Sequence, residues 1–320
     1  MNHLLRLLRF PNLVIIASTM LLIRYAIIQP IFIQYGIGLE FPLLHFIFLV
    51  LSVLIIAAAG YLINDYFDIK IDLVNKPNEV VINNYFKAKS VYRAYFILNS
   101  IALALAFYIS SKVGILTLFL IFPVTIGVLW FYSTTYKKQL LVGNILVSLL
   151  IATVPILVAL FEMPSIHAKY HDFPGAYRVL LNVIFAWCEV FALFAFLVNL
   201  IRELVKDVED FEGDNVYGRN TLPIVFGIKG AIIAINVLIL LTMCLLSYVF
   251  FKYLRVTNSG RFDWVTFCYF SLLLIIPLGA AGGMVLLAKT KKHFTIASTI
   301  IKLVMVAGIL YTLLARFKLS

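Results

Sequence analysis

Two short windows of the sequence hold most of its acidic side chains. Ten of the fifteen Asp and Glu residues fall within residues 65–79 and 203–214. Both windows contain the pattern D-x-x-D-x-x-x-D, formed by Asp65, Asp68 and Asp72 in the first window and by Asp207, Asp210 and Asp214 in the second. Each acid of the second pattern follows its counterpart by 142 residues. The repeated spacing predicts that the two windows act together.

The chemistry that suits these windows is the binding of a hard cation. On a helix, Asn64, Asp68 and Asp72 share one face, and the acids of the second pattern share another. Like charges at this spacing repel by a few tenths of a kcal/mol per pair, so a cation is needed to neutralise them. Oxygen ligands without His or Cys favour Mg²⁺, which proteins usually hold together with substrate phosphates. Two facing clusters therefore predict Mg²⁺ ions that clamp a diphosphate.

A simpler interpretation of the same acids is that they are solvated loop charges. Some of them would then pair with nearby lysines such as Lys70, Lys76 and Lys206. One isolated acidic loop is usually of this kind. Two copies of the same spacing favour the metal site instead.

The elements that carry the acids are predicted by composition. The chain is 63% hydrophobic and 13% charged, against about 45–50% and about 25% in soluble domains. A helix needs about 20 mostly apolar residues to cross a bilayer. Nine segments meet this requirement: 11–35, 43–63, 90–110, 113–132, 140–161, 179–205, 229–251, 264–288 and 295–315. The sequence therefore predicts an all-α, multi-pass membrane protein and excludes a soluble globular enzyme.

The Lys and Arg residues predict how the spans are oriented. They are about twice as numerous on the side of the amino terminus as on the other side, and such an excess marks the cytoplasmic face. We expect the protein to lie in the cell membrane. We expect its amino terminus and both acidic loops to face the cytoplasm. We also expect one domain, 1–320, whose halves (about 1–135 and 136–320) each carry one acidic pattern.

Several cations and amides stand next to the acids. Arg202 and Lys206 precede Asp207, and Lys137 follows a polar Tyr-Ser-Thr-Thr segment that begins at Tyr132. Since a diphosphate needs direct cationic contacts as its leaving-group charge grows, we expect these cations to bind phosphate oxygens. Their alternative role is orientation of the spans alone. Asn12 and Asn144 lie near cytoplasmic span ends and could line the site.

A few other polar residues fall inside apolar spans. We expect Arg24 and Glu189 to pair with each other inside the bundle as a structural contact. Lys302 also lies within a span, and the sequence assigns it no role. The five His residues are scattered and predict no metal pair.

The two acidic motifs resemble those of a known family. Asn64-Asp65-x-x-Asp68-x-x-x-Asp72 and Asp207-x-x-Asp210-x-x-Gly213-Asp214 are similar to the paired aspartate motifs of the UbiA superfamily of intramembrane prenyltransferases. The resemblance covers nearly the whole chain, including nine spans and the Tyr/Lys element after the fourth. It implies nine helices around a central cavity, where a polyprenyl diphosphate binds through Mg²⁺ under a cytoplasmic cap.

Within that superfamily, one branch is the most similar. The stretch from Arg202 to Asp214, followed by Gly218-x-x-Thr221-Leu222-Pro223, resembles the digeranylgeranylglyceryl phosphate synthases, which transfer geranylgeranyl to a glycerol-phosphate ether lipid. The resemblance implies metal ligands at Asn64, Asp68, Asp72, Asp207, Asp210 and Asp214. It implies further substrate contacts from Asp65, Tyr132 and Asn12, and catalytic roles for Asp68, Asp210, Lys137, Arg202 and Lys206.

Two alternatives stay open at this point. One is an aromatic acceptor of the homogentisate, hydroxybenzoate or naphthoate type in quinone biosynthesis, because Asn75-Lys76-Pro77 and the residues after it depart from the common pattern. The other is a membrane transporter, because transporters often contain internal repeats. Transport sites lie near the membrane midplane, however, whereas these acids are expected at one face.

Overall fold

Helices account for the whole architecture. The computed structural model describes residues 3–75, 77, 80–170, 174–257 and 260–319, so Lys76 and Glu79 lie outside it. In this part of the chain nine helical segments are long and apolar enough to cross a membrane. They comprise α2 (Phe10–Leu22) continued by α3 (Gln29–Gln34), α4 (Leu43–Asn75), α5 (Ala88–Val113), α6 (Ile121–Thr134), α7 (Val142–Tyr170), α8 (Pro174–Glu209), α10 (Leu222–Val249), α11 (Trp264–Tyr269) continued by α12 (Ile276–Leu286), and α13 (Lys291–Leu319). Two short helices, α1 (His3–Leu7) and α9 (Phe211–Val216), and the short 3₁₀ and π-helical segments Ile23–Ile28, Leu116–Leu120, Tyr136–Lys138, Phe250–Leu254 and Phe270–Ile275 complete the described elements.

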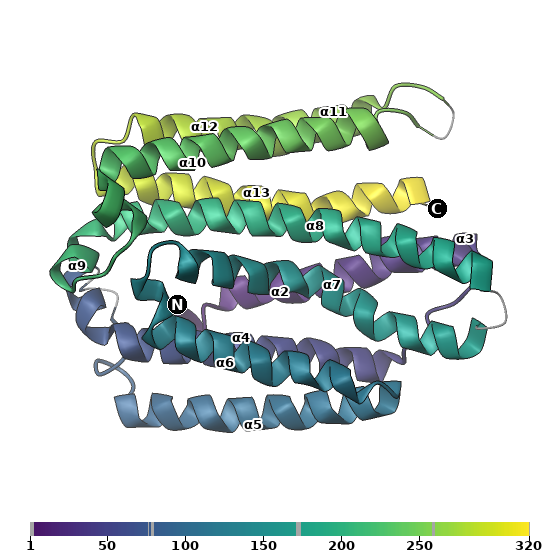
Figure 1. Cartoon of the computed structure of the whole chain (residues 1–320), viewed down its shortest axis with the longest axis horizontal. Helices are drawn as coiled ribbons and strands as arrows, with labels where there is room; N and C mark the ends of the chain where they lie inside the picture. The colour runs from purple at the N-terminus through teal and green to yellow at the C-terminus, as the bar shows by residue number, and fades with distance from the viewer. Residues whose placement is uncertain (1–2, 76, 78–79, 171–173, 258–259, 320) are drawn as a thin grey trace.

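The helices form one bundle in which they run alongside one another (Figure 1). α8 and α13 lie in the middle, with α5 at one edge and α10 to α12 at the other. The two chain ends lie at opposite ends of the bundle, as an odd number of crossings requires. α9 marks the end nearer the amino terminus, and this end carries both acidic windows.

The predicted number of spans is confirmed for the described residues, and several helices extend beyond the predicted spans. α4 continues from the predicted end at residue 63 to Asn75, and α8 continues from 205 to Glu209. α7 continues past the predicted span end at residue 161, through Pro164, to Tyr170. The reason is that hydropathy reports where a helix leaves the apolar layer, whereas the helix itself continues as long as its backbone hydrogen bonds do. The first acidic motif and Asp207 of the second therefore stand on helix ends rather than on loops.

A buried ion pair joins helices at the other end of the bundle. The expected pairing of Arg24 with Glu189 is wrong, because Glu189 is exposed on α8. Arg24 Nε donates instead to Glu162 Oε2 at 3.1 Å, and the two side chains are 2% and 0% exposed. The Arg24 guanidinium also donates to the Phe41 carbonyl oxygen and lies 4.3 Å from the Phe46 ring centroid. A buried guanidinium needs such a set of partners, and α7 supplies the carboxylate because it continues past residue 161.

Candidate active site

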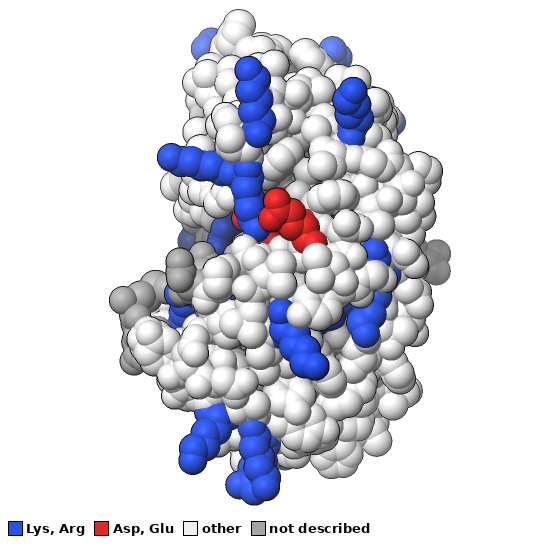
Figure 2. All heavy atoms as spheres, turned by 90° about the vertical axis from the view of Figure 1, so that its left-hand side faces the viewer, with Lys and Arg blue, Asp and Glu red and all other residues white. Residues whose placement is uncertain are grey.

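One cavity collects all the side chains that the sequence assigned to the site. It has a volume of about 580 Å³ and lies between α2, α4, α6, α7, α8 and α13. Its lining includes Asn12, Asn64, Asp65, Asp68, Asp72, Tyr132, Lys137, Arg202, Lys206, Asp207, Asp210 and Asp214. Figure 2 shows the end face of the bundle, where Asp and Glu side chains gather near the middle and Lys and Arg surround them. The two acidic windows therefore meet in space, as their repeated spacing predicts.

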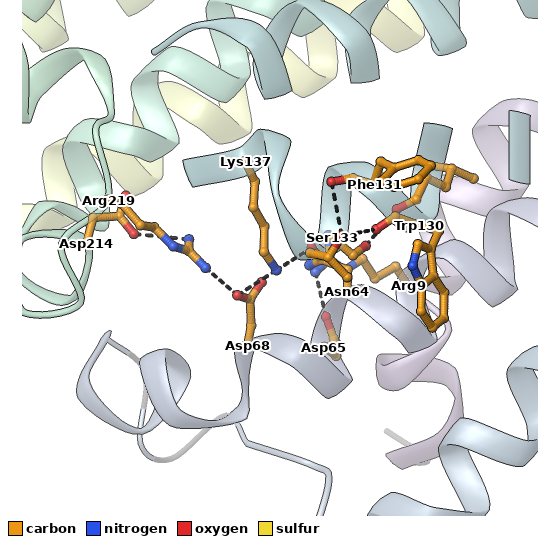
Figure 3. A network of polar contacts seen from close by, with 12 residues as sticks. Arg9, Asn64, Asp65, Asp68, Trp130, Phe131, Ser133, Lys137, Asp214 and Arg219 are labelled. Carbon is orange, nitrogen blue, oxygen red and sulfur yellow. Dashed lines mark hydrogen bonds and ion pairs between the residues drawn. The ribbon is translucent and has the colours of Figure 1, made fainter. Parts of the chain in front are cut away.

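Asp68 is the centre of the polar network in this cavity. Lys137 Nζ lies 2.7 Å from Asp68 Oδ1 and donates to Asn64 Oδ1 at 3.2 Å. Arg219 pairs with the same Asp68 oxygen and, at 3.1 Å, with Asp214 Oδ1. Figure 3 shows Asp68 between the two cations, one from each side. Asn64 and Asp68 face the same way because they are one helical turn apart on α4.

The second acidic motif is not one helical face, contrary to the expectation. α8 ends at Glu209, and Asp210 has a non-helical backbone (φ −96°, ψ 11°) before α9 begins. Asp207 therefore lies on α8, where its Oδ2 accepts a hydrogen bond from Asn144 Nδ2 at 2.7 Å. Asp214 lies on α9, which turns back over the end of the bundle. This break brings Asp214 close enough to share Arg219 with Asp68.

Close packing of α9 against α4 fixes this geometry. The Gly213 amide donates to Asn75 Oδ1 at 2.9 Å, and a Cβ at Gly213 would lie 2.5 Å from the Asn75 amide group. The Tyr217 hydroxyl donates to the Lys70 carbonyl oxygen at 3.1 Å. Only glycine at residue 213 permits this approach, so Gly213 positions the motif that contains it.

The short helical turn that carries Lys137 is held in a similar way. It spans Tyr136–Lys138, and a Cβ at Gly143 would lie 2.8 Å from Lys137 Cα. The Asn220 amide donates to the Lys138 carbonyl oxygen at 2.9 Å. The turn is thus packed between the start of α7 and the segment that carries Arg219. This packing aims Lys137 at Asp68.

Burial shifts the ionisation of the groups that lie beyond the membrane-spanning segments. Burial lowers the pKa of Lys137, and the nearby Asp68 carboxylate opposes this change. Burial also raises the pKa of Asp214 to about 6, against the opposing charge of Arg219. For Arg219, burial acts to lower the pKa, but Asp68 and Asp214 outweigh it and raise the pKa. In this network, the charge of each group therefore affects how readily its neighbours ionise.

A second set of charged residues lines the same cavity. Arg9 donates to Asp65 Oδ1 at 2.8 Å, beside Asp68 on α4 in Figure 3. Arg202 and Lys206 lie 2.9 Å and 3.7 Å from the carboxylate of Glu203. The expectation that these two cations contact phosphate stays a prediction. Lys302 Nζ donates to Asn12 Oδ1 at 2.7 Å.

The sequence predictions omitted five charged residues of the cavity, namely Arg6, Arg9, Glu203, Arg219 and Lys302. Arg219 is the most central of them, since it pairs with an acid of each motif. Its place five residues after Asp214, inside the quoted Gly218 to Pro223 segment, was the available signal. Asn144, which the sequence named as a candidate lining residue, does line the cavity.

The donor set fits Mg²⁺ shared with a substrate. Among the described residues, no group of three or more His, Cys, Asp or Glu side chains is close enough to hold a metal ion alone. Proteins usually bind Mg²⁺ through one or two carboxylates together with substrate phosphates, so a site of protein ligands alone is not required. Both cations that pair with Asp68 contact Oδ1, which leaves Oδ2 for a metal ion. The oxygen-only set excludes the softer ligands that favour Zn²⁺.

Comparison with known proteins gives the family. Residues 30–304 match the profile of the UbiA prenyltransferase family, and the chain belongs to this family. A digeranylgeranylglyceryl phosphate synthase of Methanosarcina mazei is 34% identical over 192 residues, which cover 60% of this chain and 58% of that protein. The aligned part is therefore less than two thirds of that relative.

Solved structures share the fold. A UbiA homologue from Aeropyrum pernix K1 has a TM-score of 0.63 and 15% identity, covering 93% of this chain and 97% of the other. A UbiA homologue from Archaeoglobus fulgidus bound to GPP and Mg²⁺ has a TM-score of 0.54 and 18% identity, covering 98% and 99%. These similarities confirm the all-helical membrane fold predicted from the sequence.

Proposed function

We propose that this protein catalyses the Mg²⁺-dependent transfer of a geranylgeranyl group from its diphosphate to geranylgeranylglyceryl phosphate, with release of diphosphate. The observation that carries the proposal is the convergence of both aspartate motifs on one cavity. The name of the Methanosarcina mazei relative supports the branch. The Archaeoglobus fulgidus homologue, whose structure contains GPP and Mg²⁺, supports the donor class and the metal.

The donor diphosphate would bind at the end of the cavity that contains Asp68. The residues proposed to hold Mg²⁺ are Asn64, Asp68, Asp72, Asp207, Asp210 and Asp214. Mg²⁺ bound there would neutralise the charge that grows on the diphosphate as it leaves. Lys137 and Arg219 share one oxygen of Asp68, so each can turn to a phosphate oxygen without losing all of its partners. Charge-assisted hydrogen bonds of this kind are the strong ones.

The rest of the cavity would shape the reaction. The walls include the aromatic rings of Tyr61, Phe122 and Tyr132, whose faces stabilise a nearby cation. In the proposed reaction the bond between the allylic carbon and the diphosphate oxygen breaks, and the electron pair leaves with the diphosphate. The acceptor hydroxyl oxygen forms the new bond to carbon and loses its proton. Exclusion of water by the apolar walls prevents capture of the allylic cation by water.

We further propose that the mouth of this site faces the cytoplasm. The excess of Lys and Arg on the side of the amino terminus supports this orientation. The cap expected over the site would consist of α9 and the segments beside it, which pack on the end of α4. The same orientation puts the carboxyl terminus outside.

A turnover assay with a panel of acceptors tests the proposed function. Purified protein in detergent would receive geranylgeranyl diphosphate, Mg²⁺ and one acceptor at a time: geranylgeranylglyceryl phosphate, homogentisate, 4-hydroxybenzoate or a dihydroxynaphthoate. We expect pyrophosphate release and a prenylated product with the glycerol phosphate only, abolished by a chelator. A product with an aromatic acceptor alone would overturn the acceptor, and no product with any of them would overturn the function.

A further inference from the structure

The charged residues of the cavity separate into two groups of opposite sign. The acidic group consists of Asp68, Asp72, Asp207, Asp210 and Asp214 with Lys137 and Arg219. The basic group consists of Arg6, Arg9, Arg202, Lys206 and Lys302 with Asp65 and Glu203. Among the described residues, Arg9 pairs with Asp65, and Arg202 and Lys206 pair with Glu203, so these cations pair within the basic group. Metal ions can neutralise the acidic group, whereas the four cations Arg9, Arg202, Lys206 and Lys302 outnumber Asp65 and Glu203 by two, an excess of positive charge that suits an anion.

Lys302 is the member of the basic group whose position most needs explanation. It lies in the interior of α13, a membrane-spanning helix, and is half-buried. Its Nζ donates to Asn12 Oδ1, and no carboxylate of the described residues pairs with it. A lysine at membrane depth is costly and usually marks a functional site. A neutral amide does not compensate its charge.

Two arginines near the same wall also offer hydrogen-bond donors. Arg202 Nε is buried, and within the described part of the chain it makes no hydrogen bond. Arg9 precedes α2 in the left-handed backbone region, with φ 48°, which is unfavourable for a residue with a side chain. Its guanidinium lies 5.0 Å from the Tyr61 ring centroid and borders the cavity. The chain thus holds a strained backbone conformation at a residue that adds positive charge to this wall.

A narrow apolar pocket of about 40 Å³ continues from the basic group along the same helix faces. Met305, Ile309 and Thr312 follow Lys302 on α13 at three, seven and ten residues, and all line this pocket. Ile15, Ile16 and Thr19 follow Asn12 on α2, and Ile23 follows directly after α2; all four line the pocket. At a rise of 1.5 Å per residue, ten residues extend about 15 Å. Ile15, Ile16, Ile151, Val154 and Met305 border both the pocket and the main cavity, so the two spaces are neighbours.

We infer that Lys302, Asn12, Arg202 and Arg9 form a metal-independent subsite for the phosphomonoester head of the acceptor, whose hydrocarbon chain begins beside this head between α2 and α13. The inference rests on the proposed function and specifies its acceptor as an amphiphile with a dianionic head. It assigns Arg202 to the acceptor rather than to the diphosphate. The separation of charge explains how one cavity holds two anionic substrates apart: one binds through metal ions and the other binds directly to cations.

Binding of an acceptor mimic without Mg²⁺ tests this subsite. Hexadecylglycerol phosphate would be titrated into the full-length protein in non-ionic detergent with EDTA, and compared with hexadecylglycerol and with inorganic phosphate. Lys302→Met should weaken binding of the mimic about tenfold or more, since hydrogen bonds to charged groups are removed. Lys302→Arg should restore most of the affinity. Lys292→Met, at an exposed lysine of the same helix, should leave it unchanged. Arg202→Met should weaken binding in the same direction and serves as a second variant if Lys302→Met fails to fold.

Binding of the donor is the second measurement and separates the possible outcomes. Geranylgeranyl diphosphate with Mg²⁺ should bind wild type and Lys302→Met within about twofold of each other, because its site is the acidic group. If Lys302→Met loses affinity for the mimic and for the donor to the same extent, the inference is overturned. Unchanged binding of the mimic in every variant would also overturn it. Inorganic phosphate that binds as tightly as the mimic would overturn the apolar half of the subsite. If wild type fails to bind the donor with Mg²⁺, the proposed function fails, and the mimic titration shows separately whether the anion subsite exists.

Discussion

Replacing Asp68 with Asn removes the one carboxylate that both Lys137 and Arg219 contact. In the wild type, Lys137 lies 2.7 Å from Asp68 Oδ1, and Arg219 contacts the same atom. Asn has nearly the same shape but no charge, so it would neither ligate a metal ion as an anion nor orient the two cations. Lys137 and Arg219 would keep their second partners, Asn64 and Asp214. The substitution should therefore affect the reaction much more than the fold.

The size of the effect follows from the interactions that the Asp68 carboxylate makes. A hydrogen bond to a charged group stabilises by about 1.5–3 kcal/mol, and Asp68→Asn would remove a metal ligand and an oriented cation interaction, or about 3–6 kcal/mol. Since every 1.36 kcal/mol is a tenfold change in rate, we expect turnover to fall by about 10²–10⁴-fold.

Pyrophosphate release by purified protein in detergent, with saturating geranylgeranyl diphosphate and Mg²⁺, measures this loss. Glu189→Gln is the matched control, because it also removes one acidic charge but from an exposed residue of α8. The control should retain wild-type turnover, and the thermal unfolding midpoint of Asp68→Asn should stay within a few degrees of wild type. A correctly folded Asp68→Asn protein with turnover within twofold of wild type would refute the reasoning.

Three further predictions concern pH, packing and the buried ion pair. Burial raises the pKa of Asp214 to about 6. Because Mg²⁺ would bind the ionised carboxylate, Mg²⁺-dependent binding of the donor should weaken about tenfold between pH 7 and pH 5. Asp214→Asn should remove this part of the pH dependence. Gly213→Ala puts a Cβ 2.5 Å from the Asn75 amide group. This overpacking should lower the free energy of unfolding by about 1–3 kcal/mol, measured by thermal unfolding. It should also reduce turnover in the activity assay. Arg24→Met leaves the Glu162 carboxyl buried without its cation and should destabilise the fold by about 3–5 kcal/mol, with the double variant Arg24→Met/Glu162→Met more stable than the single one.

Each of these predictions has an outcome that contradicts it. An unchanged pH dependence in Asp214→Asn would show that another group controls it. Gly283→Ala is the control for packing, because a Cβ there meets nothing within 4 Å; equal effects of the two alanines would contradict the close approach of α9 and α4. A double variant as unstable as Arg24→Met would contradict the ion-pair argument.

The membrane spans were predictable because each is a long apolar run, and a run of that length is stable in the hydrocarbon layer of a bilayer. Their ends were less predictable, since α4 and α8 continue as helices beyond the apolar layer. The twelve assigned site residues share a cavity, and for the acids the repeated spacing was the signal, since it places most of them at the same end of the bundle. The division into two halves stays a prediction.

Local sequence patterns could not predict which residues far apart in the chain contact each other. Arg219 meets an acid 151 residues earlier in the chain, and its surroundings in the sequence give no sign of that partner. Arg24 was assigned the wrong acid because the predicted span ends at residue 161, just before Glu162, whereas α7 continues through it. Lys302 was visible as a charge in a span, but its meaning depends on Asn12, which lies 290 residues away.

Equilibrium binding of geranylgeranyl diphosphate, measured with Mg²⁺ and again with EDTA, tests the central claim most directly. The claim is that the two aspartate motifs together hold a diphosphate through Mg²⁺. The account predicts tight binding by wild type with Mg²⁺ and at least a tenfold loss with EDTA. It predicts a similar loss for Asp68→Asn and for Asp210→Asn, one from each motif, and none for Glu189→Gln. Binding that is equally tight with EDTA, or unaffected by either Asp variant, would contradict it.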